Sequence, residues 1–143
     1  MSIVMNRQQI EEIIPHRDPF LLIDEIVEME VGKSVKARKY IKADDFWFKG
    51  HFPQQPVVPG VLIIEMLAQA GAVSMLALDE NKGKIGFLGG VDKAKFRRMV
   101  VPGDVLTLDV EIIKVKGPVG VGKAVASVNG EKAVTAEISF VLK

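Results

Sequence analysis

The chain has 143 residues, 48% of them hydrophobic, which suits one domain over residues 1–143 with a substantial core. Its 19 basic and 18 acidic residues nearly cancel, so the composition does not indicate binding to nucleic acid, and the absence of cysteine excludes disulfides, thiol catalysis and cysteine-bound zinc. The N-terminal residues lack signal-peptide features, and no apolar run reaches the roughly 20 residues of a membrane span. We therefore expect a cytoplasmic protein with no membrane segment.

The first predicted elements are a short helix and a hairpin. Asn6 can cap a helix that Pro15 would end. Apolar and then alternating residues predict a strand over residues 21–30, and clear alternation predicts another over residues 34–41. The Gly32-Lys33 pair forms the turn between these strands.

A rigid loop and one long helix follow. Residues 44–59 contain three prolines and several aromatic residues, which predicts a loop held in one shape. From Gly60, apolar residues recur at three- and four-residue spacing, which predicts a helix that stops near residues 81–83. Because this helix is apolar on nearly every side, we expect it to be buried on nearly every side.

The rest of the sequence predicts β structure. Alternation and turn signals indicate strands over residues 84–97, 105–115, 119–128 and 133–142. Gly86, Gly89 and Gly90 indicate bulges or close backbone approach in the first of these, and Asn129-Gly130 is a strong hairpin turn. One long helix with five or six strands predicts an α+β fold in which an antiparallel sheet wraps around the helix.

His51 lies in the rigid loop, between Gly50 and Phe52. A catalytic base needs a fixed ring and an apolar surrounding that keeps the ring neutral near pH 7, and this loop supplies both. The alternative is a buried histidine that bonds to the backbone and has only a structural role.

Glu65 lies among apolar residues of the predicted helix. A carboxylate there is costly unless it is neutral, paired or used in chemistry. Because burial raises the pKa of a carboxyl group, Glu65 could donate a proton at neutral pH. Gln69, one turn further on, could orient Glu65 by a hydrogen bond. The alternative is an exposed helix face that carries both residues, but the small apolar neighbours do not extend such a face.

Gly60 opens the helix after Pro59. The free N–H groups of a first helical turn carry partial positive charge, and they could polarise a thioester carbonyl and acidify its α-hydrogen. A plain helix start is the alternative. His51 as base, Glu65 as acid and the Gly60 N–H group together suit elimination of water from a β-hydroxy thioester, although their spacing alone does not single out this reaction.

Three segments carry a resemblance to a known family. They are PHRDPFLLIDEI (residues 15–26), GHFPQQPVVPGVLIIEMLAQAG (residues 50–71) and FLGGVDKAKFRRMVVPGD (residues 87–104). The chain resembles, over nearly its whole length, the β-hydroxyacyl-acyl carrier protein dehydratases of FabZ type, which act in fatty acid biosynthesis. The resemblance implies a hot-dog fold, a (3R)-hydroxyacyl chain on acyl carrier protein as substrate, and neither a metal nor a bound cofactor.

The resemblance also implies an assembly. It implies a homodimer with shared active sites, usually joined into a hexamer as a trimer of dimers. The histidine of the GHFP motif, here His51, then comes from one subunit, and the glutamate of PGVLxxE, here Glu65, comes from the other.

Alternative activities remain open within and beyond this fold. Glutamate at position 65, where the sister dehydratase/isomerase has aspartate, and the short chain favour the plain dehydratase. A dehydratase/isomerase or a thioesterase of the same fold is the first alternative, and a non-catalytic acyl-binding module is the second.

Acyl carrier protein is acidic, so a basic rim is expected near the substrate entrance. The densest basic cluster consists of Lys93, Lys95, Arg97 and Arg98. In a strand, the first three would share one face. A solvated strand edge guarded by lysine is an equally good interpretation. Phe96, between them, lines the acyl tunnel or fills the core, and core filling is the favoured expectation.

Two further patterns do not predict sites. Residues 117–124, GPVGVGKA, nearly match a phosphate-binding loop, but Ala124 replaces the required hydroxyl and no helix follows, so a tight hairpin is predicted. His16, Asp18 and Asp24 lack a shared helical spacing for a metal site, and the flanking prolines predict a structural turn.

Overall fold

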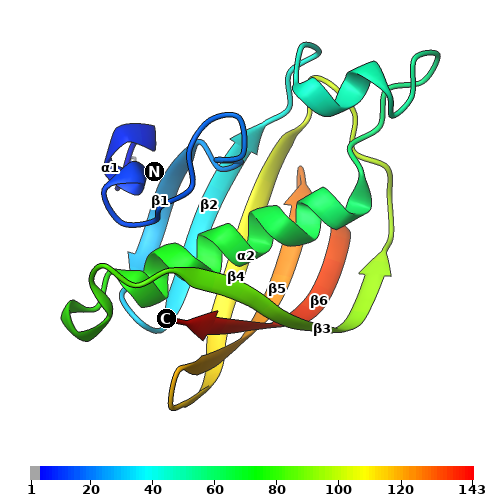
Figure 1. The fold of residues 1–143 in the computed structure, drawn as a ribbon. Coiled ribbons are helices and arrows are strands. Elements are labelled where there is room, and N and C mark those ends of the chain that lie inside the picture. The colour runs from blue at the N-terminus through cyan, green and yellow to red at the C-terminus, as the bar shows by residue number, and fades with distance from the viewer. Residues whose placement is uncertain (1–3) are drawn as a thin grey trace.

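A six-stranded sheet curves around one long helix in the computed structural model, which describes residues 4–143 (Figure 1). The first three residues, part of the segment tested for signal-peptide features, lie outside the described residues. The strands are β1 (Glu25–Glu30), β2 (Ser34–Tyr40), β3 (Gly86–Phe96), β4 (Val105–Lys116), β5 (Val119–Val128) and β6 (Glu131–Leu142). They lie in the order β1-β2-β4-β5-β6-β3, and every neighbouring pair is antiparallel. The predicted hot-dog fold is therefore confirmed.

Helix α2 (Gly60–Leu76) is the central helix, and its sequence leaves it almost no polar side to expose. Every residue from Ile63 to Leu76 is buried except Glu65. The helix approaches the sheet closely because Gly71 has no side chain, since a Cβ atom there would lie 2.5 Å from the Phe140 ring of β6. The predicted burial of this helix on nearly every side is confirmed.

Helix α2 ends earlier than predicted because a more distant side chain caps it. The Asn81 side-chain amide donates to the Met75 carbonyl at 2.9 Å, so it satisfies a carbonyl of the last turn. Asn81 itself closes a short 3₁₀ helix, η2 (Asp79–Asn81). Residues 81–83 were predicted to be the point where the helix stops. Asn81 instead caps the last turn through its side chain, five residues after the helix has ended at Leu76.

The N-terminal helix α1 (Arg7–Glu11) is capped by Asn6, as predicted. The Asn6 side chain accepts from the Gln9 N–H at 2.9 Å, and the Gln9 side chain accepts from the Asn6 N–H at 2.8 Å. The first strand begins at Glu25, later than predicted, because the buried Leu22 N–H donates to the Gln69 side chain of α2 instead of to a neighbouring strand.

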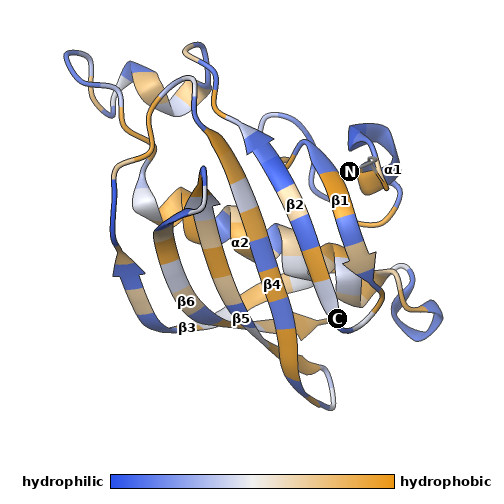
Figure 2. Cartoon of the chain, turned by 180° about the vertical axis from the view of Figure 1, so that it is seen from behind, coloured by the Kyte–Doolittle hydropathy of each residue, from blue (hydrophilic) through white to orange (hydrophobic). Residues whose placement is uncertain are grey.

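The other strands agree with the sequence pattern to within two residues at each end. Figure 2 shows the hydrophilic and hydrophobic bands that alternate along β2 and β4. Asn129 and Gly130 form the predicted hairpin turn, with φ angles of 50° and 82°. The predicted tight hairpin at residues 117–124 joins β4 to β5, with Gly117 in its turn at a φ of 57°.

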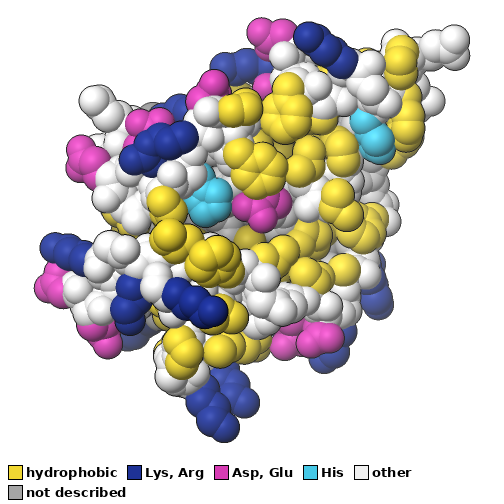
Figure 3. Space-filling model, viewed as in Figure 1, with side chains coloured by type: hydrophobic (Ala, Val, Ile, Leu, Met, Phe, Trp, Pro, Cys, Tyr) yellow, Lys and Arg dark blue, Asp and Glu magenta, His cyan; other side chains and the backbone are white. Residues whose placement is uncertain are grey.

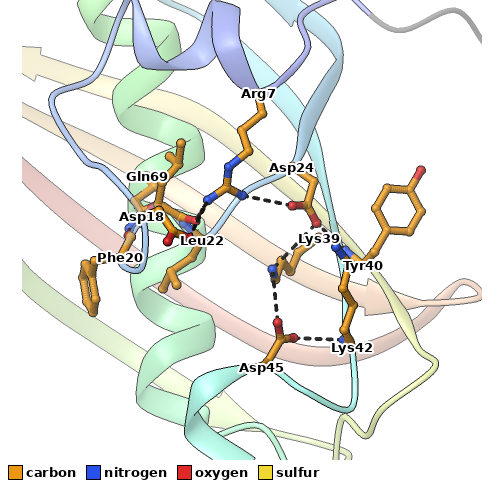
Figure 4. A network of polar contacts seen from close by, with 11 residues as sticks. Arg7, Asp18, Phe20, Leu22, Asp24, Lys39, Tyr40, Lys42, Asp45 and Gln69 are labelled. Atoms are coloured by element: carbon orange, nitrogen blue, oxygen red, sulfur yellow. Dashed lines mark hydrogen bonds and ion pairs between the residues drawn. The ribbon is translucent and has the colours of Figure 1, made fainter.

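A buried lysine joins β2 to the N-terminal region and to the short 3₁₀ helix η1 (Phe46–Lys49), as Figure 4 shows. The Lys39 ammonium lies 3.8 Å from the Asp24 carboxylate and 3.9 Å from that of Asp45, and its side chain is only 7% exposed. Arg7 of α1 pairs with Asp24 at 3.2 Å. These ion pairs fix the start of the loop that leads to His51.

Strand β3 forms one edge of the sheet and pairs only with β6 within the described chain. Its register shifts between Leu88 and Gly90, which confirms a bulge at Gly89, and again between Asp92 and Lys95. Most of its side chains are exposed. The expectation that Phe96 fills the core is wrong, because Phe96 is 55% exposed on this edge strand. No helix of the described residues is long and apolar enough to cross a membrane.

Candidate active site

His51 lies in the loop between η1 and α2, and the backbone holds its ring. Its Nδ1 atom is 2.8 Å from the Val57 carbonyl oxygen. Because a carbonyl oxygen only accepts, Nδ1 carries a hydrogen, and in the neutral ring Nε2 is therefore the acceptor. The Phe52 ring stacks on the imidazole, with the ring centroids 4.0 Å apart. In its neutral form, a half-buried imidazole oriented in this way can remove a proton through Nε2.

Gly60 shares a pocket of about 550 Å³ with His51. Apart from Arg97 and Arg98, the other lining residues are apolar: Val57, Val58, Val61, Ile63, Phe96, Met99, Val100 and Val134. No side chain of the described residues caps the N-terminus of α2, so N–H groups of its first turn are available to a ligand. A Cβ atom at Gly60 would lie 2.6 Å from the Phe96 ring, so glycine also lets this ring approach the helix.

Glu65 is the only charged side chain of α2, and Gln69 holds its carboxylate. The Gln69 Nε2 donates to Glu65 Oε2 at 3.0 Å, so the predicted hydrogen bond is present. The same amide donates to the Phe20 carbonyl at 2.9 Å and accepts from the Leu22 N–H at 2.9 Å (Figure 4). Gln69 is therefore fixed by the segment before β1. The Glu65 side chain that it holds is 20% exposed, so a ligand can reach it.

His16 lies beside Glu65, a neighbour that the sequence did not reveal. The His16 Nε2 is 3.7 Å from Glu65 Oε2. Burial lowers the pKa of His16, against an opposing effect of Glu65, so the imidazole is neutral near pH 7. The sequence predicted only a structural turn here, because the contact arises when the segment before β1 packs on α2.

A second pocket, of about 190 Å³, surrounds Glu65. It is lined by His16, Glu65, Ala68, Gln69, Ala72, Gly86, Phe87, Leu88 and Phe140. His51 is not among these residues, and Glu65 does not line the His51 pocket. Figure 3 shows the two histidine side chains apart from each other on one face, with hydrophobic side chains between them. Within one chain, the predicted base and acid therefore face separate pockets.

The four predicted carrier-contact residues separate into two groups. Lys93, Lys95 and Arg97 line a groove of about 280 Å³, so they share one face despite the bulge in β3. Arg98 follows the strand, lies 3.5 Å from Glu131, and lines the His51 pocket beside Arg97.

The groove contains two more lysines, which the sequence analysis missed. Lys123 of β5 and Lys132 of β6 line it together with Glu137, which lies 3.2 Å from the Lys93 ammonium. They lie far from Lys93 in the sequence, and the pairing of β5, β6 and β3 brings them together. Five cations and one carboxylate make this groove, which we call the basic groove, positively charged. Within residues 4–143, no cluster of three or more histidine, aspartate or glutamate side chains is placed to hold a metal ion.

The FabA-like domain family matches residues 14–137 of the chain. The chain is 59% identical to the 3-hydroxyacyl-[acyl-carrier-protein] dehydratase FabZ of Clostridium novyi over 133 residues, which cover 93% of this chain and 94% of the relative. It is 56% identical to the protein of the same name from Oceanobacillus iheyensis over 140 residues, which cover 98% and 100% of the two chains.

Solved structures share the fold. The dehydratase heterocomplex ApeI:P of Xenorhabdus doucetiae matches with a TM-score of 0.80 at 19% identity, over 94% of this chain and 90% of that one. A mutant of the thioesterase PA1618 of Pseudomonas aeruginosa matches with a TM-score of 0.69 at 16% identity, over 97% and 94%. Because dehydratases and thioesterases both appear, the fold does not identify the reaction.

Proposed function

The chain belongs to the 3-hydroxyacyl-[acyl-carrier-protein] dehydratases of FabZ type, within the FabA-like domain family, and from this membership we propose how its residues carry out the reaction. The protein eliminates water from a 3-hydroxyacyl thioester in fatty acid biosynthesis. We take the substrate to be the (3R)-hydroxyacyl chain on acyl carrier protein and the product to be the trans-2-enoyl thioester.

The base is His51, and the acid is Glu65. His51 Nε2 removes the α-proton, and the electron pair of that C–H bond forms the new double bond as the bond from the β-carbon to its hydroxyl breaks. Glu65 gives its proton to the departing hydroxyl, which leaves as water. His51 then loses its proton to solvent, and Glu65 regains one. The observation that carries this assignment is the His51–Val57 hydrogen bond, which leaves Nε2 as the free ring nitrogen.

Gly60 stabilises the charge that develops on the thioester oxygen. The first N–H groups of α2 carry partial positive charge. This charge stabilises the negative charge that develops on the enolate-like oxygen in the transition state. The mainly apolar lining of the His51 pocket strengthens the interaction because charge is screened less there than in water.

Each active site is shared between two chains of a homodimer. Two observations support this: His51 and Glu65 line separate pockets in one chain, and β3 is an edge strand with exposed apolar side chains. A second chain that pairs along β3 would bury Phe87, Leu88 and Phe96 and bring its own half-site to the interface. Further assembly of three dimers into a hexamer is our prediction, as is a cytoplasmic location.

The basic groove docks the acidic carrier protein. Its lysines and Arg97 lie close to the His51 pocket, because Arg97 lines both. A carrier bound there would deliver its arm to the catalytic residues, with charge complementarity that sets the encounter rate and the orientation.

Turnover of a hydroxyacyl carrier protein by the wild type and by His51→Ala and Glu65→Gln tests the assigned roles. We expect the wild type to form the trans-2-enoyl thioester and each variant to lose about 100-fold or more of kcat, the usual contribution of one acid–base group. Free thiol without an enoyl product would indicate a thioesterase, and a shifted double bond in the product would indicate an isomerase. Acyl binding without any turnover would indicate a binding module, and near-normal rates in both variants would refute the roles.

A further inference from the structure

We propose that His16 is a positioning residue for the dehydration: as a neutral donor it holds Oε2 of Glu65 together with Gln69, so that Oε1 presents the proton to the substrate. This inference rests on the proposed role of Glu65 as the acid. It concerns a histidine outside the GHFP motif, and it assigns a role to a contact between the segment before β1 and the central helix.

The position of His16 is determined by its own turn. The Arg17 guanidinium donates from Nη1 to the Ile14 carbonyl at 2.9 Å and to the His16 carbonyl at 2.7 Å, which ties the backbone around the imidazole. The His16 side chain is 19% exposed and faces the Glu65 pocket. The ring nitrogen that lies beside the Glu65 carboxylate is Nε2.

The hydrogen-bonding pattern indicates a neutral ring. The His16 Nδ1 is buried and has no hydrogen-bond partner among the described residues. A charged imidazolium would place an N–H group there without an acceptor, whereas the neutral form with hydrogen on Nε2 places only a lone pair there. Burial acts in the same direction, since it lowers the pKa of His16; the charged groups that face the ring are Glu65, which raises that pKa, and Arg17, which lowers it.

Neutrality is what suits His16 to an acid catalyst. A lysine or arginine beside Glu65 would hold the carboxyl group in its ionised form, with no proton to give. A neutral imidazole N–H stabilises the orientation of the carboxyl group without a charge. When Gln69 and His16 both donate to Oε2, this atom is the carbonyl oxygen of the acid, and the proton must be on Oε1.

The distance of 3.7 Å between His16 Nε2 and Glu65 Oε2 is longer than a hydrogen bond. Catalytic hydrogen bonds are commonly long in a protein without substrate and shorten in the complex. The pocket beside Glu65 leaves room for the carboxyl group to turn, so we infer that the contact shortens when an acyl chain fills this pocket.

The test compares two substitutions of similar size. His16→Gln keeps a neutral donor of similar reach, and His16→Met removes it. On hydroxyacyl carrier protein we expect His16→Met to lower kcat about 3- to 10-fold with little change in KM, which matches the loss of one neutral hydrogen bond, and His16→Gln to restore most of kcat. His16→Lys should lower kcat further than His16→Met, because its charge keeps Glu65 ionised. Asp18→Asn, in the same turn with an 87% exposed side chain, is the control and should match the wild type.

Two results would overturn the inference. The first is a wild-type kcat in His16→Met. The second is an equal loss of kcat in His16→Gln and His16→Met when both variants melt at the wild-type temperature. The failure of the proposed function looks different, because the wild type itself would then form no enoyl product. A purely structural role for His16 would lower the melting temperature of the variants and leave kcat per folded molecule unchanged.

Discussion

Gln69 joins helix α2 to the segment before β1 through one buried side chain. Its amide satisfies the carbonyl of the exposed Phe20 and the N–H of the buried Leu22, both before β1, and it also reaches Glu65. A glutamine at this position therefore has a structural effect that is separate from its hydrogen bond to Glu65.

We expect Gln69→Met to lower the free energy of unfolding by about 2 to 4 kcal/mol, because it leaves the buried Leu22 N–H and the partly buried Phe20 carbonyl without their partner, at about 1–3 kcal/mol for a fully buried group. Urea denaturation measures this loss. Gln54→Met, in an exposed part of the loop, is the control and should change stability little. An unchanged denaturation midpoint in Gln69→Met would show that water replaces the amide at no cost.

Asp109 of β4 gives a prediction about pH. Burial raises the pKa of Asp109, against an opposing effect of Lys36, and Glu28 adds to the increase. The folded state therefore binds this proton more tightly than the unfolded state does, so an ionised Asp109 lowers stability at neutral pH and the penalty disappears as pH falls.

We expect Asp109→Asn to raise the melting temperature at pH 7 and to have no such effect below about pH 4, where the carboxyl group of the unfolded chain also holds its proton. Thermal melts between about pH 3 and pH 8 measure the difference. Asp79→Asn, with a 95% exposed side chain, is the control. A gain that persists unchanged at low pH would mean that the substitution acts through packing and not through charge.

The contact between α2 and β6 provides a test at the scale of whole elements. Gly71 lowers the intrinsic stability of a helix, since alanine is favoured over glycine by about 1 kcal/mol. Its replacement would nevertheless place a Cβ atom 2.5 Å from the Phe140 ring and 3.2 Å from a Val110 methyl group.

Because the clash outweighs the gain in helix propensity, we expect Gly71→Ala to lower the free energy of unfolding by about 1 to 3 kcal/mol. Phe140→Leu should also destabilise the protein. The double variant, however, should be more stable than the sum of the two changes predicts, because leucine withdraws the ring from the added methyl group. A double-mutant cycle by urea denaturation measures this coupling, and strict additivity would contradict the steric explanation.

The elements that the sequence predicted well are those with local signals. The buried helix and five of the strands follow from periodicity and turn residues within each segment. The start of β1 and the end of α2 were predicted less well, because Gln69 and Asn81 act on them from elsewhere in the fold.

The same division applies to the candidate site. Glu65 and Gln69 are one helical turn apart, so the sequence could predict their hydrogen bond. His16 and the groove lysines Lys123 and Lys132 come to their neighbours through packing and strand pairing, which no local pattern encodes. Phe96 was misassigned because an edge strand that awaits a partner has the hydrophobic pattern of a buried one.

At the scale of the whole molecule, the separation of His51 from Glu65 predicts complementation between inactive chains. A mixed dimer of His51→Ala and Glu65→Gln chains would have one site with both substitutions and one site with none. When equal amounts are unfolded together and refolded, we expect about one quarter of wild-type activity, since half of the dimers are mixed and each has one intact site. Activity no higher than that of the separate variants would show that both residues act within one chain.

The basic groove predicts a substrate-dependent effect of charge. We expect Lys95→Glu and Lys132→Glu to raise KM for hydroxyacyl carrier protein about 10-fold, and high salt to raise KM for the wild type, because both weaken attraction to an acidic partner. Turnover of a small hydroxyacyl thioester without a carrier should not change. Lys82→Glu, with a 72% exposed side chain outside the groove, is the control. An equal rise in KM for the carrier-bound and the small substrate would show that these lysines do not act by binding the carrier.

The unpaired edge of β3 has a consequence for dilute solutions. If a working site needs His51 from one chain and Glu65 from another, a free chain has no activity, and the rate at high dilution should rise with the square of the chain concentration rather than in proportion to it. The protein would then lose specific activity on dilution and recover it on concentration, without any change in the chemistry of either half-site. The same free chains would also leave Phe87, Leu88 and Phe96 exposed to solvent.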